Sequence, residues 1–232
     1  KMKIRLTILV LVCILSIMTS LTKIVHGEPV SFESKATITF EQGDGAPTVL
    51  DPSDPTKPYT PGENDPEDDP TGHTGPLTLD YVSSVHFGEQ KIESKDMVYE
   101  STILRPFIQV TDRRGTGAGW QVTAQLSEFN SEGNPTLPGA VLTFRNGTVI
   151  SPCLLSDEPT PAEEIILYAG GPAAPVVTAE PQTGLGTWIT RWFPTSESAL
   201  NDSVTLEIPA GAATIDTHSA TITWTLSDAP GH

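Results

Sequence analysis

Apolar and polar residues alternate repeatedly along this chain, and that alternation limits its fold more than any other feature. It is clearest at residues 120–126 and 220–226, where every second residue is apolar and the residues between are Thr or Gln. Successive side chains of a β-strand point to opposite faces of a sheet, so a period of two indicates a strand with one buried face. Similar patterns predict further strands at residues 35–40, 77–81, 106–110, 140–145 and 204–208.

Turn-forming residues separate these predicted strands. Asn146-Gly147 predicts a hairpin turn, and Pro209 should end the strand before it, because proline has no amide to donate to a ladder. Only residues 162–169 have a helix-like pattern, and that stretch is short. Many short strands between Pro- and Gly-rich turns favour an all-β single domain, either a sandwich or a barrel.

Residues 43–76 differ from the rest, since they are rich in Pro, Asp and Gly and poor in apolar residues. Such a composition buries too little surface to offset ordering, so we expect a solvated, disordered acidic loop after the first strand. That strand should pair within the same domain, across the loop. A calcium site would have to be built from the loop's aspartates, and their spacing misses the pattern that calcium loops need. We therefore expect no metal at Asp51, Asp54, Asp65, Asp68 and Asp69.

The first 27 residues have the pattern of a secretory signal peptide. A short basic start precedes a mostly apolar stretch at residues 6–21, and Val25 and Gly27 are small enough for cleavage after Gly27. We expect residues 28–232 to be secreted as one β domain without a membrane span, since the apolar stretch is short for a span. Cys153 is the only cysteine after Gly27. The fold must then depend on its hydrophobic core instead of a disulfide.

Charge excludes several classes of partner. The formal net charge is −16, and four of the 13 basic residues but none of the 29 acidic ones lie in residues 1–27. The remainder therefore carries a net charge of −20. Such a surface repels nucleic acids, anionic lipids and the phosphates of wall teichoic acids.

Signs of catalysis are weak, and we predict no enzyme and no cofactor. Gly115–Gly119 is glycine-rich, but a strand pattern follows it where a nucleotide-binding loop needs a helix. Asp216, His218 and Ser219 could form a hydrolase triad, yet no nucleophile elbow accompanies them and neighbouring strand residues point to opposite faces. The spacing of His and Cys fits no zinc site. A wall hydrolase with paired carboxylates remains an alternative, although most acidic residues lie in the loop or beside turns.

Four tryptophans are the main candidates for packing or recognition. Trp120 and Trp224 lie on the apolar faces of their predicted strands, which favours core packing. Trp188 and Trp192 flank Arg191, and an exposed Trp beside Arg is a common contact for saccharides or proteins. For that second pair, core packing and an exposed aromatic contact are equally compatible with the sequence.

Two of these tryptophans lie in similar strands, GWQVTA at 119–124 and TWTLSDAP at 223–230. With them, the chain resembles the WxL surface proteins of low-GC Gram-positive bacteria over nearly all of its length after Gly27. The first motif departs from the family, because Val122 stands where the family has Leu. Three other stretches support the resemblance: GPLTLDYVSSVHFGEQKI at 75–92, LPGAVLTFRNGT at 137–148 and SATITWTLSDAP at 219–230.

The resemblance implies a non-covalent attachment to cell-wall peptidoglycan at the cell surface, with the motif strands as the binding element (Trp120, Val122, Trp224, Leu226). It also implies assembly with other surface proteins, including a membrane-anchored WxL-interacting partner. The sequence contains no LPxTG sorting signal, so we expect retention without a covalent anchor. The alternative function is an adhesin or a subunit that binds extracellular polysaccharide or host matrix and is held at the surface by a partner protein.

Overall fold

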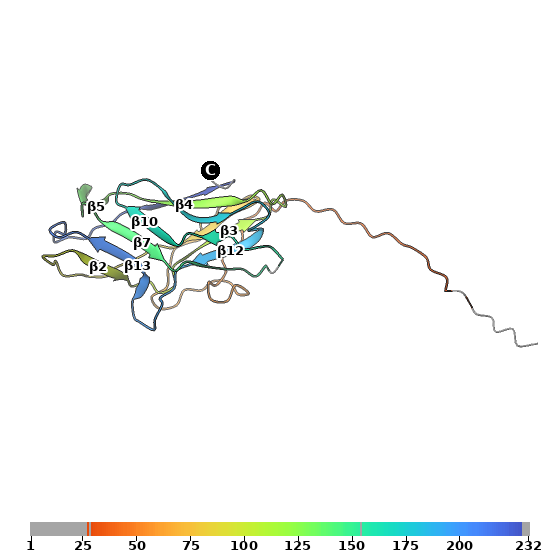
Figure 1. Cartoon of the computed structure of the whole chain (residues 1–232), viewed down its shortest axis with the longest axis horizontal. Helices are drawn as coiled ribbons and strands as arrows, with labels where there is room; N and C mark the ends of the chain where they lie inside the picture. Colours follow the sequence, from red (N-terminus) through yellow and green to blue (C-terminus); the bar gives the residue numbers. More distant parts are fainter. Residues whose placement is uncertain (1–26, 28, 154, 229–232) are drawn as a thin grey trace, which may run out of the picture. The chain divides into compact units, whose positions relative to one another are not determined.

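The computed structural model describes residues 27, 29–153 and 155–228, so the predicted signal peptide lies outside the described residues except for Gly27. The chain divides into two units, one up to Phe40 and one from Glu41 onward. The described residues contain no helix, and their strands pair antiparallel throughout (Figure 1). The predicted all-β class is confirmed.

The described residues of the first unit contain no strand, so the strand predicted at residues 35–40 is wrong. Ile38 is 75% exposed and Phe40 is 84% exposed. Alternation supplies an apolar face, but a strand also needs a neighbouring ladder to bond its backbone. This segment has the apolar face without the ladder.

The second unit contains three four-stranded sheets and one two-stranded hairpin. The first sheet is β1 (Leu77–Val82), β3 (Phe107–Asp112), β12 (Gly186–Arg191) and β8 (Thr148–Ile150), in that order. The second is β10 (Glu164–Tyr168), β7 (Val141–Arg145), β13 (Asn201–Ile208) and β2 (Met97–Ser101). The third is β14 (Ile222–Ser227), β4 (Trp120–Leu126), β11 (Ala174–Ala179) and β9 (Thr160–Pro161). The hairpin is β5 (Phe129–Ser131) with β6 (Asn134–Thr136).

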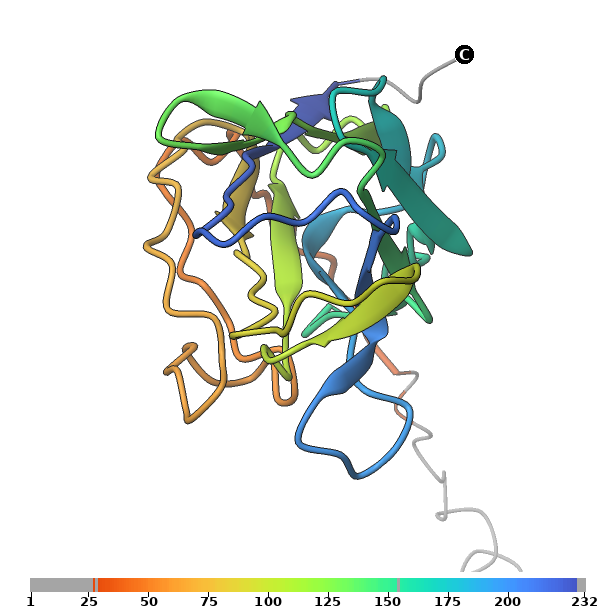
Figure 2. The same cartoon turned by 90° about the vertical axis from the view of Figure 1, so that its left-hand side faces the viewer.

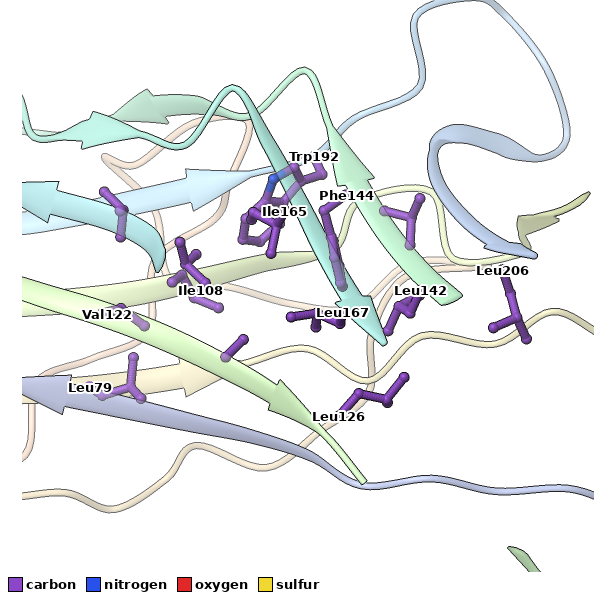
Figure 3. Close-up of a cluster of buried hydrophobic side chains, with 14 of the residues drawn as sticks. Leu79, Ile108, Val122, Leu126, Leu142, Phe144, Ile165, Leu167, Trp192 and Leu206 are labelled. Carbon is purple, nitrogen blue, oxygen red and sulfur yellow. The ribbon is translucent and has the colours of Figure 1, made fainter. Parts of the chain in front are cut away.

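The sheets pack as a sandwich, because each presents an apolar face to one shared core. Figure 3 shows Leu142 of β7 and Leu167 of β10 facing Val122 and Leu126 of β4 across that core. Phe144 and Trp192 belong to the same core, with ring centroids 5.0 Å apart. Three of the sheets therefore share a single hydrophobic interior, and none closes into a barrel.

Two local expectations are corrected. Residues 162–169 contain strand β10 and no helix. Ile165 and Leu167 point into the core while Ile166 and Tyr168 are exposed, and the apolar residues on both faces had hidden the period of two. The Asn146-Gly147 turn does not form a hairpin. It joins β7 to β8, which belong to different sheets, and Asn146 has a positive φ of 57°.

The acidic segment, residues 43–76, makes contacts that the expected solvated, disordered loop would lack. It contains no named strand, but Val49 is buried in a second small core with Tyr81, Phe107 and Ile189. Tyr59 packs edge-on against Phe107, with ring centroids 4.9 Å apart. In Figure 2 the segment runs in orange along one side of the strands. Its few apolar residues cover the outer face of the first sheet, which explains why every residue of β3 is buried.

An arginine holds this acidic segment to the sandwich. Arg105 forms hydrogen bonds with both carboxylate oxygens of Asp65 and an ion pair with Asp51 at 3.4 Å. Burial raises the pKa of Asp65, but the hydrogen bonds from Arg105 and the Gly62 amide outweigh it, so this pKa lies below its usual range. Asp68 accepts hydrogen bonds from the Ser84 amide and hydroxyl at 2.7 and 2.5 Å. These carboxylates therefore serve as anchors of the segment.

Candidate functional site

The two motif strands, far apart in the sequence, are direct neighbours in the third sheet. β14 pairs antiparallel with β4 along the whole length of β14, with Val122 opposite Leu226 and Ala124 opposite Trp224. Paired residues share a face of the sheet. The third residues of both motifs therefore meet on the inner face, and the polar residues between them meet on the outer face.

The inner face of this pair is part of the core. Trp120 is 0% exposed, and its indole Nε1 donates a hydrogen bond to the Gly184 carbonyl at 3.0 Å. Trp224 is partly buried and lies 6.2 Å from Trp192, centroid to centroid. Val122 is fully buried opposite Leu226, so it keeps the inward apolar role of the family's leucine. These side chains build the sheet.

Of the two alternatives left open for Trp188 and Trp192, the structure favours core packing over an exposed aromatic contact, because they are only 5% and 1% exposed. β12 is an inner strand between β3 and β8, and both of its faces are covered. The Trp188 indole donates to the Leu185 carbonyl at 3.0 Å. Arg191 lies 4.8 Å over the ring of Phe193 and donates to the Pro52 carbonyl of the acidic segment. It acts there as a link between segment and sheet.

The outer face of the motif pair is a surface of amides and hydroxyls without a charged side chain. We call this set the polar face. It extends onto β11, where the Gln121 amide donates to the Thr178 hydroxyl at 3.1 Å. At the other end of β4, the Gln125 amide donates to the Gly171 carbonyl at 2.9 Å. The members of the polar face on the two motif strands are Gln121, Thr123, Gln125, Thr223, Thr225 and Ser227.

A shallow groove continues the polar face across β11 and β9. Gln121 and Thr178 stand on its β4 and β11 side, and Thr160 and Pro161 of β9 form the other. Pro175, which is exposed, adds apolar surface. Glu180 is the only charged residue among the described residues that line the groove. The groove thus offers hydroxyl, amide and flat apolar contacts, and nothing that would attract phosphate.

The three residues considered as a hydrolase triad, Asp216, His218 and Ser219, form local turn contacts instead. Asp216 accepts a hydrogen bond from the Ser131 hydroxyl, which lowers the pKa of that carboxyl. The two ring nitrogens of His218 lie 3.1 Å from the Thr136 hydroxyl and 3.0 Å from the Thr214 carbonyl. Ser219 pairs its backbone with Asn130. The structure therefore does not connect these three side chains as nucleophile, base and orienting acid.

One carboxyl elsewhere has an unusual environment. Asp80 lies at a bulge in β1 and accepts hydrogen bonds at Oδ2 from Gln109 and Thr111, at 2.8 and 2.6 Å. Burial raises its pKa above the usual range despite these bonds. Its Oδ1 has no hydrogen-bond partner in the described part of the chain. Asp80 is enclosed between the first sheet and the acidic segment, so we assign it a structural position.

Residues 27, 29–153 and 155–228 include no group of three or more His, Cys, Asp or Glu side chains placed to hold a metal ion. Within those same ranges no helix has the length and apolarity needed to cross a membrane.

Comparison with known proteins identifies the family. The chain matches the family model described as "WxL domain surface cell wall-binding" over residues 27–230. No significant match was found among curated proteins or solved structures. The matched range includes both tryptophan strands, the acidic segment and every strand of the sandwich. This chain therefore belongs to the WxL family of surface proteins that bind the cell wall.

Proposed function

We propose that this protein attaches non-covalently to peptidoglycan through the polar face and the adjoining groove. The observation that carries the proposal is the pairing of β4 with β14, because it aligns the outward residues of both motifs into one surface. In this proposal the motif tryptophans do not contact the wall. They pack on the inner face of the sheet with Val122 and Leu226, and so hold the two strands in place.

The chemistry of this surface fits the uncharged sugars of a glycan strand. Peptidoglycan strands present hydroxyl and acetamido groups, which pair with amide and hydroxyl side chains. Prolines such as Pro161 and Pro175 offer flat apolar surface to a sugar ring. Each neutral hydrogen bond contributes only about 0.5–1.5 kcal/mol net. Stable retention then depends on several contacts, and on the many identical sites that a wall polymer offers.

Electrostatics support binding that is short-range. The chain has a net charge of −16, and wall teichoic acids are polyanions that it should avoid. The polar face is a local exception on an acidic protein, since it carries no charge. We therefore expect binding to bare peptidoglycan to equal or exceed binding to walls that keep their teichoic acids.

We further propose that the protein is secreted through the predicted signal peptide, has no enzymatic activity, and joins other surface proteins, including a membrane-anchored WxL-interacting partner. Secretion rests on the pattern of residues 1–27, the lack of activity on the weak catalytic motifs, and the partners on the family resemblance. The adhesin alternative was favoured by an exposed Trp188 and Trp192, and their burial removes that support.

Co-sedimentation tests the wall proposal. Purified secreted protein is mixed with wall sacculi, with teichoic acids either stripped or intact, and the pelleted fraction is measured. We expect pelleting with stripped walls. Thr225→Val removes one hydroxyl of the polar face but keeps the β-branched shape, so it should weaken binding about fivefold, the equivalent of about 1 kcal/mol.

Thr225→Glu should weaken binding more, because it places a charge on the polar face. Val98→Glu is the control, since it adds the same charge to a position of β2 in the second sheet that is 57% exposed. It should leave pelleting unchanged. Recovery of all wild-type protein in the supernatant, or equal losses in both Glu variants, would contradict the proposal.

A further inference from the structure

β14 is a sheet edge that leaves its inner face incompletely covered. Among the described residues it pairs with β4 alone. Its inward side chains, Ile222, Trp224 and Leu226, pack against the core but are only partly buried. Exposed edges of this kind are templates for a further strand.

The edge strand β1 shows what a covered edge looks like in the same molecule. The Thr71 amide donates to the Asp80 carbonyl at 3.0 Å, and the Thr71 hydroxyl donates to the Leu79 carbonyl at 2.5 Å. All residues from Thr78 to Tyr81 are buried. A loop therefore covers the β1 edge, while the β14 edge keeps a partly exposed apolar strip.

A second feature of the chain has the complementary pattern. Residues 30–40 place an apolar residue at nearly every even position, and the four large ones are exposed: Val30 by 75%, Phe32 by 91%, Ile38 by 75% and Phe40 by 84%. The residues between are Ser, Glu, Lys and Thr. A run of apolar side chains this exposed marks an interaction site in a soluble protein.

We propose that residues 30–40 of one molecule add as a fifth strand to the β14 edge of a second copy. Main-chain hydrogen bonds would extend the ladder, and alternate apolar side chains would cover Ile222, Trp224 and Leu226. This is β-strand addition, in which backbone bonds supply affinity and alternate side chains supply specificity. The contact joins different surfaces of the two molecules, so it closes as a reciprocal dimer or extends as a chain.

Charge favours this chain's own segment as the occupant. The protein carries a net charge of −16, whereas residues 30–40 contain one Glu and one Lys and are neutral. They can thus approach an acidic domain without a local charge penalty. Their Thr37 and Thr39 would continue the row of Thr223 and Thr225 on the outer face, because paired residues share a face. The added strand would then widen the polar face, although self-association does not depend on what that face binds.

The test is the mass of the full secreted protein, measured by light scattering over a range of concentrations. Association should strengthen as salt is added, since salt screens the repulsion between two acidic molecules. The double variant Ile38→Asp/Phe40→Asp removes the apolar side chains and should raise the dissociation constant at least about tenfold. Thr37→Asp/Thr39→Asp adds the same charge on the opposite face of the strand. It should have a clearly smaller effect.

Hydrogen exchange locates the contact. Association should slow exchange of the Ile222–Leu226 amides, and Ile38→Asp/Phe40→Asp should restore it. The proposal is overturned if the wild-type protein stays monomeric at every concentration. This holds even if the amides of residues 30–40 are protected from exchange within the monomer. Equal loss of association in both double variants would overturn it too. So would protection confined to another strand.

Discussion

The motif strands β4 and β14 have similar sequences and lie side by side, but they differ in position. β4 has neighbours on both sides, and its inward residues Trp120, Val122 and Ala124 are completely buried. β14 has one neighbour among the described strands, and its inward residues are half-covered. The same motif therefore sits once at the centre of a sheet and once at its edge. Position in the sheet, more than residue type, should decide what each tryptophan contributes.

The largest expected effect is on Trp120. Trp120→Ala should lower the free energy of unfolding by about 3–5 kcal/mol, because it removes a fully buried side chain and leaves a cavity. It also leaves the Gly184 carbonyl without the 3.0 Å hydrogen bond from the indole. Urea denaturation of the purified protein measures the change. Thr123→Ala, on the outer face of the same strand, is the control and should cost about 0.5 kcal/mol or less.

Gly184→Ala should lower the free energy of unfolding nearly as much, because it changes a residue that packs directly against Trp120. Gly184 has a φ of +69°, and an added Cβ would lie 2.5 Å from the Ala179 Cβ and 2.8 Å from the Trp120 Nε1. Backbone strain and the clash together should cost about 2–4 kcal/mol. Gly133→Ala separates the two causes, since Gly133 has a φ of +83° but nothing within 4 Å of an added Cβ. If Gly184→Ala and Gly133→Ala lower the free energy of unfolding equally, the close packing against Trp120 contributes nothing to stability.

At the edge the same truncation should cost less. Trp224→Ala should lower the free energy of unfolding by about 1–2 kcal/mol, since a partly buried side chain gives up less apolar area. Its ring neighbours Phe144 and Trp192 lie 6.1 and 6.2 Å away and keep their own contact. Urea denaturation again provides the measurement. If Trp224→Ala lowers the free energy of unfolding as much as Trp120→Ala does, position at the centre or the edge of the sheet does not decide what each tryptophan contributes.

Much of the sandwich was predictable, since most of its longer strands have one buried face and one polar face. Residues 120–126 and 220–226 are the best examples, and the structure places β4 and β14 there. The failures have identifiable causes. β12 is buried on both faces, so Trp188 had no alternation to mark it as core, and Trp192 follows directly after that strand. β10 exposes Ile166 and Tyr168, which made its apolar residues resemble a helix face.

The site itself was only half predictable. The tryptophan strands could be found from their residues, but the pairing of β4 with β14 depends on topology, which no local pattern encodes. The acidic segment shows a similar limit. Its composition predicted solvation, while Val49, Tyr59 and the Arg105 ion pairs attach it to the first sheet. A few well-placed side chains outweighed the average composition.

The smallest expected effect is a coupling between the third residues of the two motifs, tested by exchanging one methylene between them. Val122→Leu places extra volume in a fully buried site and should cost about 1–3 kcal/mol. Leu226→Val removes a methylene at the edge and should cost less than about 1 kcal/mol.

The two side chains are directly opposite each other. In the double variant, the volume lost at Leu226 accommodates part of the volume gained at Val122. The double variant should therefore be destabilised by at least about 0.5 kcal/mol less than the sum of the single variants. Urea denaturation measures all three variants. If the destabilisation of the double variant equals the sum of the two single variants, the larger side chain at position 122 does not occupy the volume freed at position 226. The two motifs would then pack independently although their strands are paired.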